Sequence, residues 1–186
     1  MKKYILIAGA NGAGKSTLYR TFRNIFDMPR VNIDEIVRSF GDWRNSSDVI
    51  KAGKIAIKQI EDNFNKGITF NQETTLCGHD IISNIKKAKE LGYYVEIHYV
   101  GVASVDIAKQ RVAHRVSEGG HGISEADIER RYVQSFKRLK EVVKMVDMVV
   151  LYDNTESFNR FAVYKNGEIH SMVVPFPIWY VEAMGT

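Results

Sequence analysis

The stretch that decides the fold is MKKYILIAGANGAGKS, residues 1–16. Residues 4–8 form a short, almost wholly apolar run, which is typical of a parallel strand covered on both faces. Residues 9–16 then spell G-x-x-x-x-G-K-S, and residues 17–26 carry apolar side chains at helical spacing. A strand before this motif and a helix after it are the context that a phosphate-binding loop requires.

The loop predicts a site for a nucleoside triphosphate. Backbone N–H groups of residues 11–16 would point inward at the start of a helix and form a concave anion site. The Lys15 ammonium would reach the β- and γ-phosphates, and the Ser16 hydroxyl would ligate Mg²⁺. We therefore expect ATP, or alternatively GTP, together with Mg²⁺. The candidate nucleotide-binding residues are Gly9, Asn11, Gly12, Ala13, Gly14, Lys15, Ser16 and Thr17.

Length and composition indicate one soluble domain over residues 1–186. The chain is 45% hydrophobic and 26% charged, which is ordinary for a globular protein and argues against disorder. A formal charge of +4 suits an anionic ligand, but no long Lys/Arg block points to nucleic acid. The one cysteine excludes an internal disulfide and fits a cytoplasmic location. No apolar run approaches the length of a membrane span.

Strands alternate with helices along the chain, which predicts a parallel sheet with right-handed crossovers. The expected helices cover residues 17–26, 35–40, 46–64, 81–91, 104–116 and 124–146. The expected parallel strands cover residues 4–8, 30–34, 68–73, 94–100 and 147–152. Residues 160–174 read as a β-hairpin around an Asn-Gly turn. Ligands in such folds bind beyond the carboxyl ends of the strands, where the phosphate-binding loop and two acidic strand ends would meet.

Asp34 is the first of these acids and the candidate catalytic base. Transfer of a phosphoryl group to an alcohol needs a carboxylate that orients the acceptor hydroxyl and takes its proton. The alternative is that Asp34 and Glu35 only stabilise the start of the following helix. Arg38, on that helix, is a further candidate for substrate contact.

Glu73 and Thr75 follow the next strand and are candidate acceptor contacts, either to a substrate hydroxyl or to a water bound to Mg²⁺. A polar turn at the strand end would place the same residue types there without any function.

Arg111 and Arg115 are candidate catalytic residues of a lid over about residues 111–131. They lie four residues apart, so they share a helical face, and a glycine-rich segment at 119–122 could hinge the lid. Such arginines would neutralise charge on the transferred phosphoryl group, and a closed lid would exclude water. The alternative is a solvated basic helix face paired with nearby glutamates.

Four segments, taken in order, resemble the zeta toxin family of small phosphotransferases. They are Gly9–Ser16, Asn32-Ile33-Asp34, residues 70–76 (FNQETTL) and the arginines around residues 119–122. The resemblance covers roughly residues 3–152. Asp34 and the Glu73-x-Thr75 element carry most of the discrimination, because many P-loop proteins share the loop.

The resemblance implies a kinase with an adenylate-kinase-like three-layer α/β sandwich. Characterised members phosphorylate the sugar of UDP-N-acetylglucosamine and are held inactive by an antitoxin. Carried over, Asp34 is the general base, Glu73 and Thr75 contact the acceptor, and Arg111 or Arg115 contacts the transferred group. Cys77 and Trp43-Arg44-Asn45 depart from the family pattern at positions concerned with the acceptor.

The sequence thus predicts an ATP-dependent small-molecule kinase that acts on a sugar-nucleotide or similar metabolite. Two alternatives stay open. One is a non-catalytic nucleotide-binding switch that docks a partner through the basic stretch 130–144. The other is a kinase for nucleic-acid 5′ ends, which the mild positive charge permits but does not require.

Overall fold

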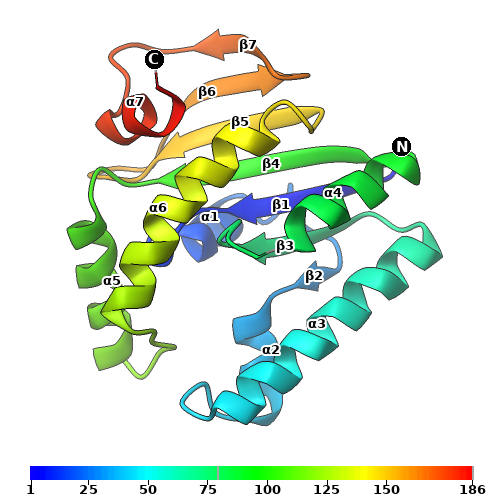
Figure 1. The fold of residues 1–186 in the computed structure, drawn as a ribbon, viewed down its shortest axis with the longest axis vertical. Coiled ribbons are helices and arrows are strands. Elements are labelled where there is room, and N and C mark those ends of the chain that lie inside the picture. Colours follow the sequence, from blue (N-terminus) through cyan, green and yellow to red (C-terminus); the bar gives the residue numbers. More distant parts are fainter. Residues whose placement is uncertain (79, 186) are drawn as a thin grey trace.

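The computed structural model describes residues 1–78 and 80–185 and contains a seven-stranded sheet in the order β2-β3-β1-β4-β5-β6-β7. The first five strands of this order run parallel, and β6 and β7 are antiparallel to their neighbours. Helices α4 and α6 cover one face of the sheet and α1 covers the other, which gives three layers (Figure 1). The predicted α/β sandwich with five parallel strands is confirmed. The C-terminal hairpin extends the same sheet.

The bounds of the elements agree with the sequence expectations for most of the chain. The strands are β1 (Lys3–Ala8), β2 (Arg30–Val31), β3 (Phe70–Thr74), β4 (Tyr94–Gly101), β5 (Met148–Asp153), β6 (Asn159–Lys165) and β7 (Glu168–Met172). The helices are α1 (Lys15–Thr21), α2 (Ile33–Phe40), α3 (Ser46–Lys66), α4 (Asp80–Glu90), α5 (Val105–Ser117), α6 (Glu125–Val142) and α7 (Ile178–Met184).

Four parts of the chain differ from the expectations. Helix α1 ends at Thr21 and not at residue 26, and α6 ends at Val142 and not at residue 146, since turns follow both helices. Asp34 does not end a strand, because the side chain of Asn32 accepts hydrogen bonds from the N–H groups of Asp34 and Glu35 and starts α2. Asp34 is therefore the second residue of a helix. The short helix α7 was not expected. Its seven residues are too few to show a helical periodicity, but its Trp179 and Tyr180 are fully buried.

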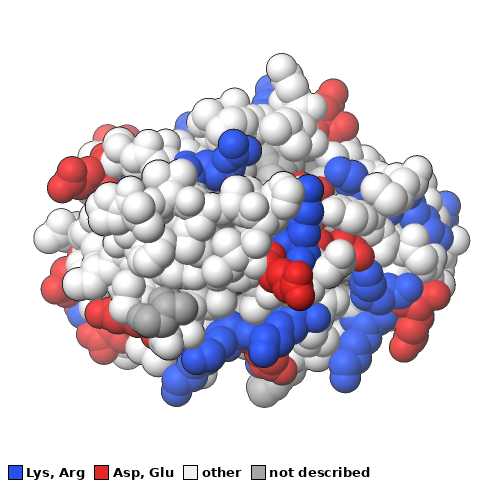
Figure 2. Space-filling model, turned by 90° about the horizontal axis from the view of Figure 1, so that it is seen from above, with Lys and Arg blue, Asp and Glu red and all other residues white. Residues whose placement is uncertain are grey.

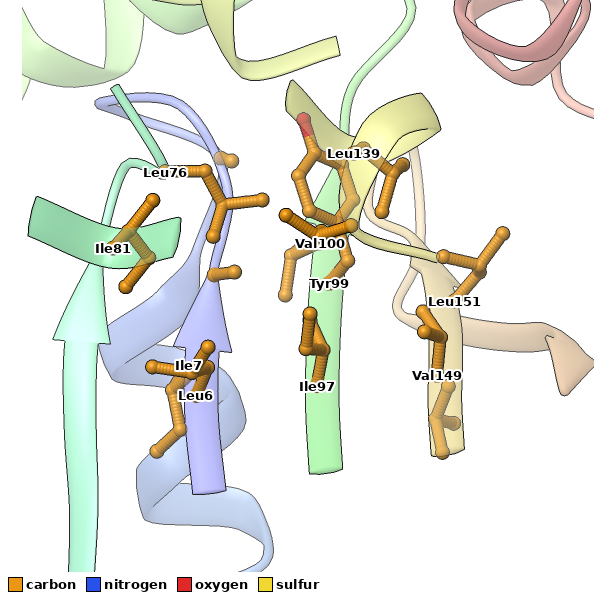
Figure 3. Packing of buried hydrophobic residues seen from close by; sticks show 14 of the residues in the cluster. Leu6, Ile7, Leu76, Ile81, Ile97, Tyr99, Val100, Leu139, Val149 and Leu151 are labelled. Carbon is orange, nitrogen blue, oxygen red and sulfur yellow. The ribbon is translucent and has the colours of Figure 1, made fainter. Parts of the chain in front are cut away.

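The core lies between the sheet and the helices on each face. Figure 3 shows Ile97 and Tyr99 of β4, Val149 and Leu151 of β5 and Leu139 of α6 pointing into one layer. Every side chain of the central strand β1 from Tyr4 to Ala8 is buried. Because β1 pairs with β3 on one side and β4 on the other and its side chains are packed, the loop that follows it starts from a fixed point.

The chain turns from β6 to β7 at Asn166 and Gly167, with φ of 50° and 81°. Both residues occupy the left-handed region that a two-residue hairpin turn requires. Figure 2 looks onto the β7 end of the molecule, where a broad area is uncharged and Lys and Arg gather toward its margins. No helix in the described part of the chain is long and apolar enough to cross a bilayer.

Candidate active site

The phosphate-binding loop joins the carboxyl end of β1 to α1. The carbonyl of Gly14 accepts hydrogen bonds from the N–H groups of Thr17 and Leu18, at 3.0 Å each, and so begins the helix. Gly14 has φ of 108°, and an added Cβ would clash with the amide of Asn154, so glycine is required there. Ser16 and Thr17 are exposed at the start of α1, where their hydroxyls are accessible to a ligand.

Lys15 is buried and its ammonium folds back over the loop. Its Nζ donates to the carbonyls of Gly9 at 2.9 Å and Ala10 at 3.0 Å. Burial lowers the pKa of Lys15; the carboxylates of Glu73 and Asp34 oppose this shift, and the nearby charge of Arg115 adds to it. Three charged groups from separate parts of the sequence therefore lie close enough to Lys15 to act on its pKa.

Asp34 lies beside a cleft of about 280 Å³ at the other side of this site. Its Oδ1 is 3.5 Å from Nε2 of His121, which comes from the loop between α5 and α6. Burial lowers the pKa of His121, Asp34 opposes that shift, and Arg115, Arg131 and Arg38 reinforce it. His121 is therefore neutral at pH 7, and an N–H at Nε2 would point a donor toward the Asp34 carboxylate without forming a full ion pair.

The ring of Trp43 forms the wall of this cleft next to His121, with the two ring centres 5.2 Å apart. The predicted substrate residue Arg38 also lines it, as does Arg44. An aromatic face with guanidinium groups around it can hold a sugar or a base together with a phosphate.

Glu73 is fixed by two residues of the β2 region. It forms an ion pair with Arg30 and accepts a hydrogen bond from Nδ2 of Asn32 at 3.0 Å. Thr75 follows the end of β3, half-buried, and the next residue, Leu76, has a positive φ of 63° although it is not glycine. A strained, fully buried residue at this point holds the turn after β3 in one conformation.

Arg111 and Arg115 point into the interior, so the alternative of a solvated basic face is wrong for this pair. Arg111 Nη2 donates to the carbonyl of Thr155 at 3.0 Å. Its Nη1, and Nε and Nη2 of Arg115, are buried with no hydrogen-bond partner within the described residues. The glutamates of α6 instead pair with Lys109, at 2.5 Å for Glu129 and 3.5 Å for Glu125.

These unpartnered donors fit an anionic ligand. A buried guanidinium group whose N–H donors have no acceptor destabilises the folded protein by roughly 1–3 kcal/mol for each unpaired donor, unless an anion binds there. The triphosphate of a nucleotide held by the loop would supply oxygens next to them. The chemistry of these donors is thus compatible with the nucleotide site that the sequence predicts, which stays a prediction.

Sequence reasoning missed several residues of the site. Arg30 and Asn32 orient Glu73, and Trp43 lines the cleft. Asn154 donates from Nδ2 to the carbonyl of Ala13 at 2.8 Å and so holds the phosphate loop. One signal was available, since Asn32 and Glu35 have the spacing of a helix capping box. The position of Asn154 depends on β5 lying beside β4, which no local pattern reveals.

Comparison with known proteins identifies relatives of this chain. The profile of the Zeta toxin family matches residues 1–172. An uncharacterised protein of Haemophilus influenzae is 37% identical over 130 residues, which cover 70% of this chain and 92% of that protein.

Among solved structures, the fold is similar to that of AvrRxo1-ORF1 in its complex with ORF2 and ATP. The TM-score is 0.70 at 16% identity, with 92% of this chain and 60% of that chain covered. The PezAT toxin–antitoxin system of Streptococcus pneumoniae matches with a TM-score of 0.62 at 20% identity, covering 85% of this chain and 70% of that chain. The chain thus spans about three fifths of the AvrRxo1-ORF1 chain.

Proposed function

The chain belongs to the zeta toxin family of P-loop phosphotransferases, and from that premise we propose that it is an ATP-dependent kinase for a hydroxyl of a small metabolite. Residues 1–186 act as one kinase domain in the cytoplasm, with a lid over about residues 111–131. The observation that carries this proposal is the buried Lys15 ammonium in the phosphate loop, close enough to Asp34, Glu73 and Arg115 for their charges to act on its pKa, together with the unpartnered guanidinium donors of Arg111 and Arg115.

Each group has a separate role in the transfer. Lys15 leaves the loop carbonyls to bind the β- and γ-phosphates, and Ser16 contributes its hydroxyl to Mg²⁺, which neutralises phosphate charge. The acceptor oxygen forms a bond to the γ-phosphorus as the bond from that phosphorus to the bridging oxygen of ADP breaks. Asp34 accepts the proton of the acceptor hydroxyl, and Arg111 and Arg115 stabilise the charge on the transferred group.

The acceptor occupies the cleft at Asp34, Arg38 and Trp43. An aromatic wall favours the apolar face of a sugar ring, and the guanidinium groups favour a phosphate. Glu73 and Thr75 would contact acceptor hydroxyls from the opposite side. A sugar nucleotide has these features, so UDP-N-acetylglucosamine is the first acceptor to test.

An antitoxin protein is the partner that this proposal implies. Both structural neighbours were solved in systems with a second chain, ORF2 for AvrRxo1-ORF1 and the antitoxin of PezAT. A partner that covered the nucleotide site would keep the kinase inactive.

The decisive experiment incubates the protein and Mg²⁺ with γ-labelled ATP and a small-metabolite extract, and in parallel with 5′-hydroxyl oligonucleotides. Label on a metabolite that disappears with the Asp34→Asn protein supports the proposal. Label on the oligonucleotide instead would make the protein a 5′-end kinase. Nucleotide binding without any transfer would make it a switch module, and absence of nucleotide binding would contradict all three functions.

A further inference from the structure

We propose that helix α7 forms one wall of the site for the nucleoside part of the nucleotide, so that residues beyond the family match at 1–172 take part in nucleotide binding. The proposal rests on the nucleotide-binding function proposed above and adds where the base and ribose lie. It starts from a second cleft, of about 260 Å³, which lies apart from the acceptor cleft.

This second cleft lies between the β5–β6 loop and the beginning of α7. One side is polar and comes from Thr155, Glu156 and Ser157 of the loop and from Asn159, the first residue of β6. The other side is apolar and comes from Pro177 and Ile178 at the start of α7. A planar base needs an apolar surface for its face and hydrogen-bonding groups for its edge, and this cleft offers both.

The loop that lines the cleft is connected directly to the phosphate site. Asn154 contacts the phosphate loop through its hydrogen bond to the carbonyl of Ala13 at 2.8 Å. The next residue, Thr155, accepts the hydrogen bond of Arg111 on its carbonyl at 3.0 Å. A nucleotide whose phosphates lie on the loop near Arg111 would therefore extend its nucleoside toward residues 155–159.

Helix α7 is firmly attached at this place. Nε1 of Trp179 donates to Oδ1 of Asp153 at 2.8 Å, and the same carboxylate oxygen accepts from the hydroxyl of Thr155 at 2.7 Å. The indole covers Gly101 at the end of β4, where an added Cβ would clash with the ring. It also stacks on Phe136 of α6, with ring centres 5.7 Å apart. Trp179 is thus a positioning residue that couples α7 to the loop holding Arg111.

Ile178 offers a direct test, because it lies on the cleft and is exposed, whereas Val181 is an exposed residue of the same helix that does not line the cleft. Calorimetry would measure the Kd of two probes, MgATP and inorganic tripolyphosphate, which has no nucleoside. We expect Ile178→Ser to raise the Kd for MgATP about fivefold to tenfold. The same change should leave the Kd for tripolyphosphate within about twofold of wild type, and Val181→Ser should leave both probes unchanged.

Trp179→Phe supplies a second measurement, because it keeps one aromatic ring at this position and removes the N–H donor to Asp153 together with the second ring of the indole. Without this hydrogen bond Asp153 and Thr155 are less firmly held, so the Kd for MgATP should rise about threefold or more. The Kd for tripolyphosphate should rise less. The assignment of the cleft would be overturned if a variant lost affinity equally for both probes. It would also be overturned if the Ile178 variant bound MgATP as tightly as the wild type. If neither probe binds the wild-type protein, the proposed function fails first, and the two failures are thereby distinguished.

Discussion

At the scale of single residues, the position of Lys15 shows what the loop gains when a nucleotide binds. Without a phosphate its ammonium is satisfied by the carbonyls of Gly9 and Ala10. Binding would replace two neutral acceptors by anionic oxygens, and an ammonium is attracted more strongly to an anion than to a neutral carbonyl. The buried lysine is therefore ready to exchange partners at small cost.

Asp34→Asn should lower turnover by about two orders of magnitude or more and leave the Kd for MgATP near the wild-type value, because the amide cannot take the proton of the acceptor. Steady-state kinetics and calorimetry measure the two quantities. Asp42→Asn is the matched control, since Asp42 lines the same cleft but pairs with Arg44. Similar losses in both variants would remove the base role from Asp34.

His121 makes the reaction sensitive to acid. Burial lowers its pKa from the ordinary 6.5, so the ring is neutral at pH 7 and gains a proton only when the pH falls below 6.5. The charged ring would then form an ion pair with Asp34 and compete with the acceptor hydroxyl. Turnover should therefore fall as pH is lowered through this range, and His121→Asn should shift or flatten that acidic limb. An unaltered pH profile in the variant would contradict the coupling.

At the scale of secondary-structure elements, helix α5 separates two kinds of basic residue. One face turns Arg111 and Arg115 inward, where Nη1 of Arg111 and Nε and Nη2 of Arg115 lack partners within the described part of the chain. The other carries Lys109, which pairs with glutamates of α6. The two faces predict different consequences for similar substitutions.

Arg115→Ala should reduce turnover by about a hundredfold or more and change the Kd for MgATP much less, because the arginine acts mainly on charge that develops during transfer. Lys109→Ala on the same helix should change turnover less than about twofold, since an exposed ion pair contributes little. Single-turnover kinetics together with MgATP titration separate the two effects. A loss confined to nucleotide affinity in the Arg115 variant would contradict the lid role.

Strand β4 carries a buried polar cluster on the face covered by α1. Glu96 contacts His98 at 2.6 Å and Lys3 at 3.2 Å, and Nδ1 of His98 lies 3.0 Å from the hydroxyl of Tyr152. Burial by itself would raise the pKa of Glu96, but the hydrogen bonds and charges of His98 and Lys3 outweigh burial and hold that pKa below 4.5. The native state therefore favours the carboxylate form.

Glu96→Gln should lower the free energy of unfolding by about 2–4 kcal/mol at pH 7, because one partner of a buried pair is lost. A carboxyl group whose pKa is depressed on folding contributes stability above its unfolded pKa, and this is lost as pH falls through its folded pKa. The difference from wild type should thus shrink below about pH 4.5 in urea titrations. Glu90→Gln, at an exposed position, is the control. A pH-independent difference would argue that the pair is not charged.

At the scale of the whole molecule, the family match ends at residue 172 but the core does not. Trp179, Tyr180 and Ala183 of α7 are buried, and the hydroxyls of Tyr180 and Tyr164 lie 2.6 Å apart between α7 and β6. The final helix therefore belongs to the same hydrophobic core as the sheet.

A chain ending at Met172 should be less stable than the full chain by about 3–5 kcal/mol or more, because it loses a buried tryptophan and tyrosine and exposes their neighbours. A chain ending at Gly185 should have the same free energy of unfolding as the full chain. The midpoint of urea unfolding measures both. Equal midpoints for the two truncated proteins would show that α7 packs too weakly to stabilise the sheet.

Much of this architecture follows from local patterns in the sequence. The apolar run of β1, the glycines and Lys15 of the loop, and the alternation of strands with helices depend on interactions between near neighbours along the chain, which sequence periodicity records. The same is true of the Asn-Gly turn, because two consecutive residues with positive φ are a local requirement. The parallel sheet and the location of the phosphate site could therefore be predicted.

The tertiary structure decided the rest, because contacts between distant segments leave no periodic signal. Only the fold shows that Arg115 is buried, that His121 reaches Asp34, and that Arg30 and Asn32 hold Glu73. The same holds for α7, whose place depends on the fit of Trp179 over Gly101. By itself, the sequence determined a parallel sheet with the phosphate-binding loop motif at the carboxyl end of its first strand. Packing between distant residues decided which side chains surround that site, since burial and charge pairing depend on the whole chain.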